Sequence, residues 1–254
     1  MTVSLWPLAI QALHVIAACA AIILALWHSS HRDASGPLLV KVNVALGLSA
    51  MWALGAAALG PQNAIVELLA SGTYLGWLWL LFGLFAHDMR DTMLKPIKPV
   101  VYALAFVEIG QIGLTLAQIR FAAEPGSYDV IMSFAIMFRL LFCIGALVLV
   151  HNLYAGGAQQ SRHALRWPAA ALAVLWLYDL NLYTIAYLAH AYPLPLIDLR
   201  GAALLAVIAL LGYGTMRTRT ALRFQPSRSF AFRSFSLGVI GGYLVVMVLI
   251  AQAI

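Results

Sequence analysis

Apolar residues run along this chain in eight stretches, each close to twenty residues long and separated from the next by a short polar segment. A helix needs about 20 apolar residues to cross the ~30 Å hydrocarbon core of a bilayer. Within lipid, only a helix or a closed barrel satisfies its own backbone hydrogen bonds. The pattern therefore predicts an all-α fold, a polytopic bundle of about eight transmembrane helices. The predicted spans are 4–28, 38–60, 64–87, 97–119, 130–153, 168–190, 196–216 and 235–253.

The polar segments between these spans are too short to hold a folded soluble domain. The longest, 217–234, joins the last two spans and carries five arginines. We therefore expect residues 1–254 to form a single transmembrane domain. The last span is still apolar where the sequence reaches Ile254. We expect from this that the chain is truncated before a further span.

The overall composition agrees with a membrane protein that has little soluble mass. Apolar residues make up 63% of the chain and charged residues 9%, and the mean hydropathy is +0.92. Soluble domains contain about 45–50% apolar and about 25% charged residues. A soluble helical bundle would also need polar helix faces, which these stretches lack, so the composition excludes that class.

Positive charge is concentrated in alternate polar segments. Lys and Arg loops of membrane proteins lie on the cytoplasmic side, which predicts a periplasmic N-terminus and a multi-pass protein of the cell inner membrane. The net charge of +6 then reflects these loops and their contact with the lipid bilayer, and we expect no nucleic-acid partner. The residues concerned are Arg32, Lys41, Arg90, Lys95, Lys98, Arg162, Arg166, Arg217, Arg219, Arg223, Arg228 and Arg233, whereas Arg120 and Arg200 lie in the intervening segments.

Four ionisable residues fall inside the predicted spans: Glu67, Glu108, Arg139 and Asp179. An Arg or Asp at the bilayer centre costs about 2.5–3.5 kcal/mol on insertion scales, so each should face protein and be paired. Arg139 is the only cation expected among three carboxylates. We predict that it pairs with Glu108, because their spans are sequential and both lie near the middle. Structural pairing and a ligand, proton or quinone-like head-group site both remain open.

The sixth span carries a polar and aromatic face, because every third or fourth residue of a helix lies on one side. This face is either an aromatic pocket open to the periplasm or a hydrogen-bonded seam between helices, and the sequence leaves both open. Polar residues of the fourth span could supply the opposite wall. The candidate ligand-binding residues are Trp176, Asp179, Tyr183, Tyr187, His190, Glu108, Gln111 and Arg139, with Thr115 and Gln118 beside Gln111.

Signs of a cofactor or a catalytic centre are missing from the sequence. Five histidines lie near predicted inner span ends without the HxxxH spacing of a paired ligand site, and the few lysines are not central in a late span, which argues against a retinal Schiff base. No GxSxG, HExxH, Walker A or GxGxxG motif occurs. We expect no cofactor, no metal and no catalytic residue in this chain. The histidines are His28, His31, His87, His151 and His163.

Several segments resemble the membrane region of PEP-CTERM-system sensor histidine kinases of the PrsK type. The segments are WLYDLNLYT at 176–184, DLRG at 198–201, PSRSFAFRSFSL at 226–237 and GGYLVVM at 241–247. ELLASGTYL at 67–75 in the third span is compatible with the same family. The order and spacing of these segments carry the resemblance, chiefly from Trp176 onward.

The resemblance implies a polytopic sensor that is followed by a last span, a GAF domain and a histidine-kinase core. Such a kinase phosphorylates a response regulator of exopolysaccharide and exosortase-linked genes. These residues contain no phospho-acceptor helix and no ATP-binding boxes, so kinase activity cannot be assigned to them. The partners implied are a cytoplasmic kinase module and a response regulator, reached through a missing C-terminal part, and we expect a homodimer.

The leading hypothesis is therefore the membrane-embedded sensing region of a two-component sensor histidine kinase. Signal binding around Asp179, Arg139 and Glu108 would shift helix packing. A small transporter or channel that uses the same three residues as a proton or solute path is the alternative. A membrane-embedded assembly subunit without a ligand is a third.

Overall fold

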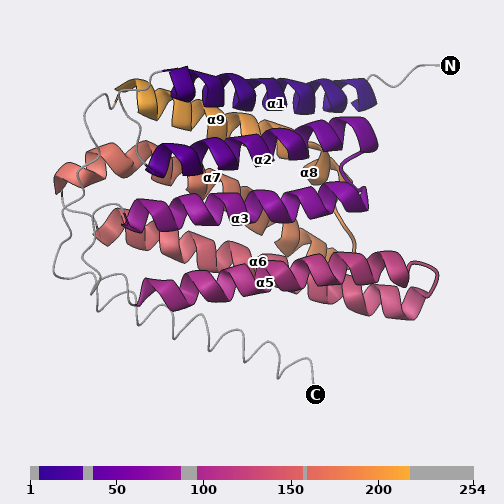
Figure 1. Cartoon of the computed structure of the whole chain (residues 1–254). Coiled ribbons are helices and arrows are strands. Elements are labelled where there is room, and N and C mark those ends of the chain that lie inside the picture. The colour runs from indigo at the N-terminus through magenta and orange to yellow at the C-terminus, as the bar shows by residue number, and fades with distance from the viewer. Residues whose placement is uncertain (1–5, 31–36, 87–95, 157–158, 218–254) are drawn as a thin grey trace.

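The computed structural model describes residues 6–30, 37–86, 96–156 and 159–217, and every regular element in these ranges is a helix (Figure 1). The all-α prediction is confirmed. The helices are α1 (Trp6–Ser30), α2 (Pro37–Leu59), α3 (Ala64–Ala86), α5 (Ile97–Arg120), α6 (Pro125–Gly156), α7 (Gln159–Ala189), α8 (Leu194–Asp198) and α9 (Arg200–Arg217).

Seven of the predicted spans correspond to helices that are long and apolar enough to cross a membrane. The first four helices begin and end within two residues of the predicted limits, whereas α6 and α7 extend further at their polar starts. The eighth predicted span, 235–253, lies outside the described residues. The fold of the described part is that of a multi-pass helical membrane protein.

Glycine and proline residues shape two of the connections between helices at one end of the bundle. Gly60 follows α2 with a φ of 88°, and its N–H donates to the Ala56 carbonyl at 3.0 Å. Glycine tolerates this left-handed conformation and commonly ends helices. Pro193 precedes α8 and Pro195 lies in its first turn, where the N–H that a proline lacks would have no intrahelical partner. The chain forms the short α8 there and begins α9 at Arg200.

The helices pack as a closed ring of neighbours in the order α1, α2, α3, α5, α6, α7 and α9, with α9 returning to α1. Figure 1 shows this ring flattened into two layers, with α1, α2, α3 and α5 in one layer and α6, α7 and α9 behind it. Helices α3 and α6 also meet directly across the layers. Side chains that point inward from both layers therefore share one interior.

Aromatic side chains fill the middle of this interior. The ring centroids of Tyr74 in α3 and Phe142 in α6 lie 5.1 Å apart, and those of Phe142 and Trp176 in α7 lie 6.4 Å apart. Both pairs are edge-to-face, the geometry that aromatic rings favour. Trp77 in α3 is also fully buried, and its Nε1 donates to Ser49 Oγ in α2 at 3.0 Å. This packing fixes the two layers around the polar residues described next.

A buried charged cluster between the two layers

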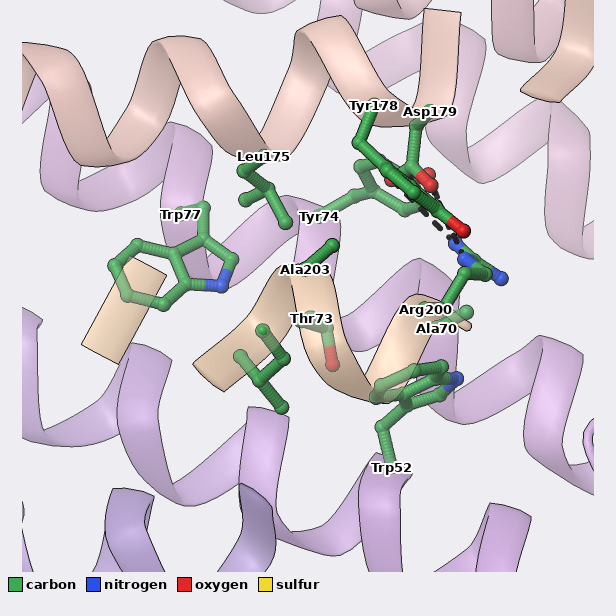
Figure 2. Close-up of a pocket in the computed structure, with 11 residues that line it drawn as sticks. Trp52, Ala70, Thr73, Tyr74, Trp77, Leu175, Tyr178, Asp179, Arg200 and Ala203 are labelled. Atoms are coloured by element: carbon green, nitrogen blue, oxygen red, sulfur yellow. Dashed lines mark hydrogen bonds and ion pairs between the residues drawn. The ribbon is translucent and has the colours of Figure 1, made fainter. Parts of the chain in front are cut away.

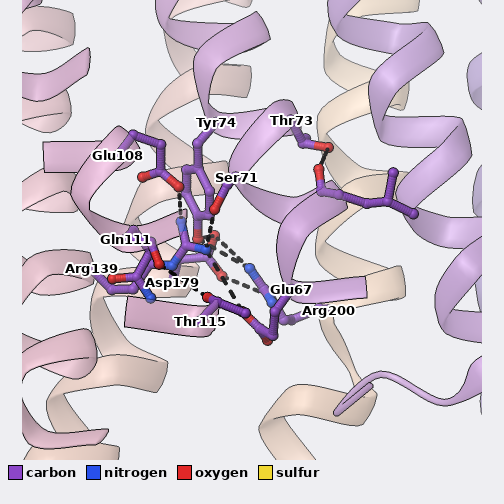
Figure 3. Close-up of polar contacts among 11 residues, drawn as sticks. Glu67, Ser71, Thr73, Tyr74, Glu108, Gln111, Thr115, Arg139, Asp179 and Arg200 are labelled. Atoms are coloured by element: carbon purple, nitrogen blue, oxygen red, sulfur yellow. Dashed lines mark hydrogen bonds and ion pairs between the residues drawn. The ribbon is translucent and has the colours of Figure 1, made fainter. Parts of the chain in front are cut away.

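A group of polar and charged side chains lies between the layers, in the half of the bundle where α3, α6 and α9 begin and α5 and α7 end (Figure 3). We call it the central cluster. Its members come from five helices and are joined by hydrogen bonds and ion pairs. They are Glu67, Ser71, Tyr74, Glu108, Arg139, Asp179 and Arg200.

Arg139 and Glu108 form one ion pair of the central cluster, between α6 and α5. Arg139 Nη1 donates to Glu108 Oε1, and Arg139 Nη2 donates to Ser71 Oγ in α3 at 3.1 Å. Arg139 is 1% exposed and Glu108 is 0% exposed. The predicted Glu108–Arg139 pair is confirmed, and it ties three helices together.

Arg200 and Asp179 form a second ion pair, in which Arg200 Nε donates to Asp179 Oδ1 at 3.1 Å. The sequence-based placement of Arg200 in a polar connection was wrong, and so was the expectation that Arg139 is the only buried cation. A break at Leu199, between α8 and α9, makes Arg200 the first residue of a helix, and it is buried. A cation at a helix N-terminus opposes the helix dipole, so Asp179 offsets an otherwise unfavourable position.

Tyr74 joins the two ion pairs. Its hydroxyl donates to Asp179 Oδ2 at 2.5 Å and accepts a hydrogen bond from Arg200 Nη2 at 3.1 Å. The guanidinium carbon of Arg139 lies 4.4 Å from the centroid of the Tyr74 ring, which places the cation over the aromatic face. One side chain of α3 thus contacts both arginines and one carboxylate, and these three partners all lie in the other layer.

Glu67 lies in the first turn of α3 and its side chain is 28% exposed. The sequence placed it well inside a span, whereas the structure places it at the end of one. Glu67 Oε2 is 3.7 Å from Arg139 Nη2, a looser contact than that of Glu108. The cluster therefore contains three carboxylates against two guanidiniums, and the additional carboxylate is the one that reaches the bundle end.

The face predicted on α7 divides along its length. Trp176, Asp179 and Tyr183 are buried, Tyr187 is half-buried, and His190 is exposed beyond the end of the helix with a φ of 48°. Asp179 uses its oxygens in hydrogen bonds to Tyr74 and Arg200 on other helices. The geometry of the buried part is that of an interhelical seam, and His190 does not join the central cluster.

A small cavity adjoins the seam between α2, α3, α7 and α9 (Figure 2). Its volume is about 30 Å³, which suits one or two water molecules rather than a quinone-like head group. Arg200 lies over the Trp52 ring, 5.2 Å from the ring centroid. Of the candidate ligand-binding residues, only Asp179 lines this cavity, whose wall is formed by Trp52, Ala70, Thr73, Tyr74, Trp77, Leu175, Tyr178, Asp179, Arg200, Ala203 and Leu204.

Gln111 and Thr115 are buried on α5, on the same side as Glu108 (Figure 3). The predicted polar wall of α5 is therefore buried and continues from Glu108, a member of the central cluster. Among the described residues, no group of three His, Cys, Asp or Glu side chains is arranged to hold a metal ion.

Sequence reasoning missed Ser71, Tyr74, Trp52 and the inward position of Arg200. A signal for two of them was present, because Ser71 and Tyr74 follow Glu67 at i+4 and i+7 and so share its helical face. Trp52 offered no such signal within a uniformly apolar helix. The burial of Arg200 depends on where the proline-containing segment ends, which periodicity does not specify.

No protein-family model, no characterised protein and no solved structure matches this chain.

Proposed function

We propose that this chain is the membrane-embedded sensing region of a two-component sensor histidine kinase linked to exopolysaccharide and exosortase regulation. The observation that carries the proposal is the central cluster, in which the hydroxyl and ring of Tyr74 connect two buried ion pairs across the layers. Packed interiors respond in discrete steps rather than by continuous deformation. A signal that alters one ion pair would therefore change how the layers fit together.

The alternating basic segments orient the bundle in this proposal. They put the N-terminus in the periplasm of a Gram-negative inner membrane, with eight spans in the chain. The central cluster then lies in the periplasmic half, where α3, α6 and α9 begin. A signal from the cell envelope would reach it without crossing the bilayer.

Helix α9 is the route by which the cluster would influence the cytoplasmic side. Arg200, its first residue, contacts Asp179 and Tyr74, and the helix runs from there to Arg217. A helix transmits an axial shift or rotation along its length. A change at Arg200 would thus move the far end of α9, toward the following span and the kinase module, most simply within a homodimer.

The distribution of buried polar residues favours sensing over transport. Outside the central cluster, the buried polar side chains of the described residues are His14, His28, Ser49, Gln111, Thr115 and Asn152, of which only His28 and Asn152 lie near the ends of α1 and α6. Buried Phe142, Leu172 and Val207 are among the apolar residues that fill the interior beyond the cluster. A proton or solute path across the membrane needs polar groups at successive depths, and the described part of the chain concentrates them in the half that holds the central cluster.

The coding sequence beyond the Ile254 codon provides the direct test. An open frame that encodes one further apolar span, a GAF domain and the kinase phospho-acceptor and ATP-binding motifs is the expected result. A stop codon immediately after Ile254 would contradict the proposal. Transport predicts instead a proton or solute flux in proteoliposomes that Asp179→Asn abolishes.

The sensing role of the cluster is tested in the full-length protein. Asp179→Asn removes the charge that pairs with Arg200, and we expect it to change the autophosphorylation rate several-fold while membrane insertion is retained. Thr184→Ala, one turn further along the exposed side of α7, is the matched control and should leave the rate unchanged. Equal rates for Asp179→Asn and the wild type would remove the cluster from signalling.

A further inference from the structure

One face of α5 changes abruptly from apolar to polar at Glu108. Ile97, Val101 and Leu104 are buried on this face in the first half of the helix. Glu108, Gln111, Thr115 and Gln118 continue it at steps of three or four residues, so all seven side chains lie in one line along the helix. Glu108, Gln111 and Thr115 are buried, and Gln118 near the helix end is half-buried.

Four polar atoms along this line have no hydrogen-bond partner among the described residues. They are Glu108 Oε2, Gln111 Oε1, Gln118 Nε2 and, from the facing helix α6, Arg139 Nε. Leaving a buried donor or acceptor unpaired costs about 1–3 kcal/mol, and more for a charged group. Native proteins pair nearly all such groups with protein or with ordered water. Four such atoms along one helix face point to partners that all of them can reach.

The chemistry of these atoms indicates what those partners are. Glu108 Oε2 accepts hydrogen bonds, Arg139 Nε donates one, and the Gln111 and Gln118 amides each offer both a donor and an acceptor. A partner for all of them must itself donate and accept at close spacing. Water does both and typically makes about three hydrogen bonds when buried, whereas a metal cation would serve only the acceptors.

We propose that the polar face of α5 is a one-sided water-access route, which leads from the bundle end where α5 terminates to the buried Glu108–Arg139 pair. Glu67, which is 28% exposed in the first turn of α3, lies beside its mouth. Glu67 Oε2 is 3.7 Å from Arg139 Nη2, and α3 packs directly against α5. The route is closed beyond Glu108 by Leu104 and Val101.

Such a route makes Glu108 a site for proton exchange with one aqueous phase. The charged groups that face it are Arg139 from α6 and Glu67 from α3, with the Tyr74 hydroxyl of α3 further along the cluster. Protonation of Glu108 would neutralise the partner of Arg139. The inference concerns access to the pair and is independent of the proposed sensing role.

Cysteine accessibility tests the route in the reconstituted protein. In a background with Cys19→Ala and Cys143→Ala, single substitutions Thr115→Cys and Gln118→Cys are treated with a small charged methanethiosulfonate, which reacts with thiolates in contact with water. Leu116→Cys and Ile119→Cys are matched controls at similar depth, because both side chains are 53% exposed on the outer side of the bundle, where lipid covers them.

We expect modification of the Thr115 and Gln118 positions at least tenfold faster than at the two control positions, and from one side of the membrane only. Equal rates at the four positions, or modification from both sides, would overturn the proposal. Solid-state NMR of the unsubstituted protein provides a second measurement. Magnetisation transfer from water to the Arg139 Nε–H is expected, and its absence would likewise overturn the proposal.

Discussion

Arg139 contacts four side chains of the opposite layer. It is fully buried and bound to Glu108, Ser71 and the face of Tyr74, with Glu67 at 3.7 Å. A buried ion pair is expensive to desolvate, and it adds little net stability when both partners are present. Removing one partner destabilises the protein strongly, because the remaining charge stays unpaired in a low-dielectric interior.

We therefore predict that Arg139→Gln lowers the free energy of unfolding by about 3–5 kcal/mol. The double substitution Arg139→Gln with Glu108→Gln should recover a large part of that loss. Arg120→Gln, at the exposed end of α5, should change the free energy by less than about 0.5 kcal/mol. Denaturant titration in mixed micelles measures all three variants, and strict additivity of the two single losses would contradict the pairing.

Tyr74→Phe tests the bridge between the two ion pairs separately. The substitution keeps the ring that lies against Arg139 and removes the hydroxyl that contacts Asp179 and Arg200. We expect a loss of about 1–2 kcal/mol, because hydrogen bonds to charged groups contribute about 1.5–3 kcal/mol and hydrogen bonds within membrane bundles contribute less on average. The same unfolding titration on Tyr102→Phe, which removes a hydroxyl at a 67% exposed position, should show no loss.

At the residue scale, the sequence predicted which charged residues are paired in the interior better than it predicted their partners. Charged residues within apolar spans must be paired, and this reasoning identified Arg139, Glu108 and Asp179 together with the first pair. It did not find the partner of Asp179, because Arg200 is 21 residues away and across a break in the helix. The link to Tyr74 spans 105 residues, a separation over which helical periodicity carries no information.

Among the helices, α7 and α9 approach each other closely at a small residue near the end of α9. A Cβ added at Gly214 would lie 2.6 Å from the Cβ of Trp167. That atom is attached directly to the α7 backbone and cannot rotate away. The Trp167 and Tyr213 rings also pack edge-to-face with centroids 4.6 Å apart, so the local fit of these two helices depends on the glycine.

Gly214→Ala should consequently destabilise the bundle by about 1–3 kcal/mol, the usual cost of overpacking. Gly113→Ala in α5 is the matched control, because nothing lies within 4 Å of its added Cβ and alanine has the higher helix propensity. Thermal unfolding should show a lower midpoint for the first variant and an unchanged or higher midpoint for the second. Equal midpoints would mean that α7 and α9 are not in close contact there.

The elements themselves were largely predictable, because span length follows from bilayer thickness and each apolar stretch is bounded by polar or proline-containing segments. The break at Leu199 between α8 and α9 was not predicted, and it falls inside the predicted span 196–216. Hydropathy averages over a window of about twenty residues and does not respond to a single interrupted turn. That turn decides whether Arg200 faces water or the cluster.

At the scale of the molecule, the described helices form a two-layer bundle, and a bilayer does not drive apolar helices together. Lipid tails are as apolar as leucine, so association depends on packing and on hydrogen bonds between helices. Here the aromatic residues Tyr74, Phe142 and Trp176 supply the packing, and the central cluster supplies the polar contacts between layers. The order of helices around the ring was not predictable, since every span has a similar apolar surface.

The central claim of the proposed function is that the cluster sets the position of the far end of α9. Spin labels at Val40, near the start of α2, and at Met216, near the end of α9, report on that end of the bundle, and both positions are exposed. The Val40–Met216 distance distribution is measured by pulsed electron paramagnetic resonance in a cysteine-free background. We predict that Asp179→Asn shifts this distribution and that Tyr102→Phe does not. Identical distributions for wild type and Asp179→Asn would contradict the claim.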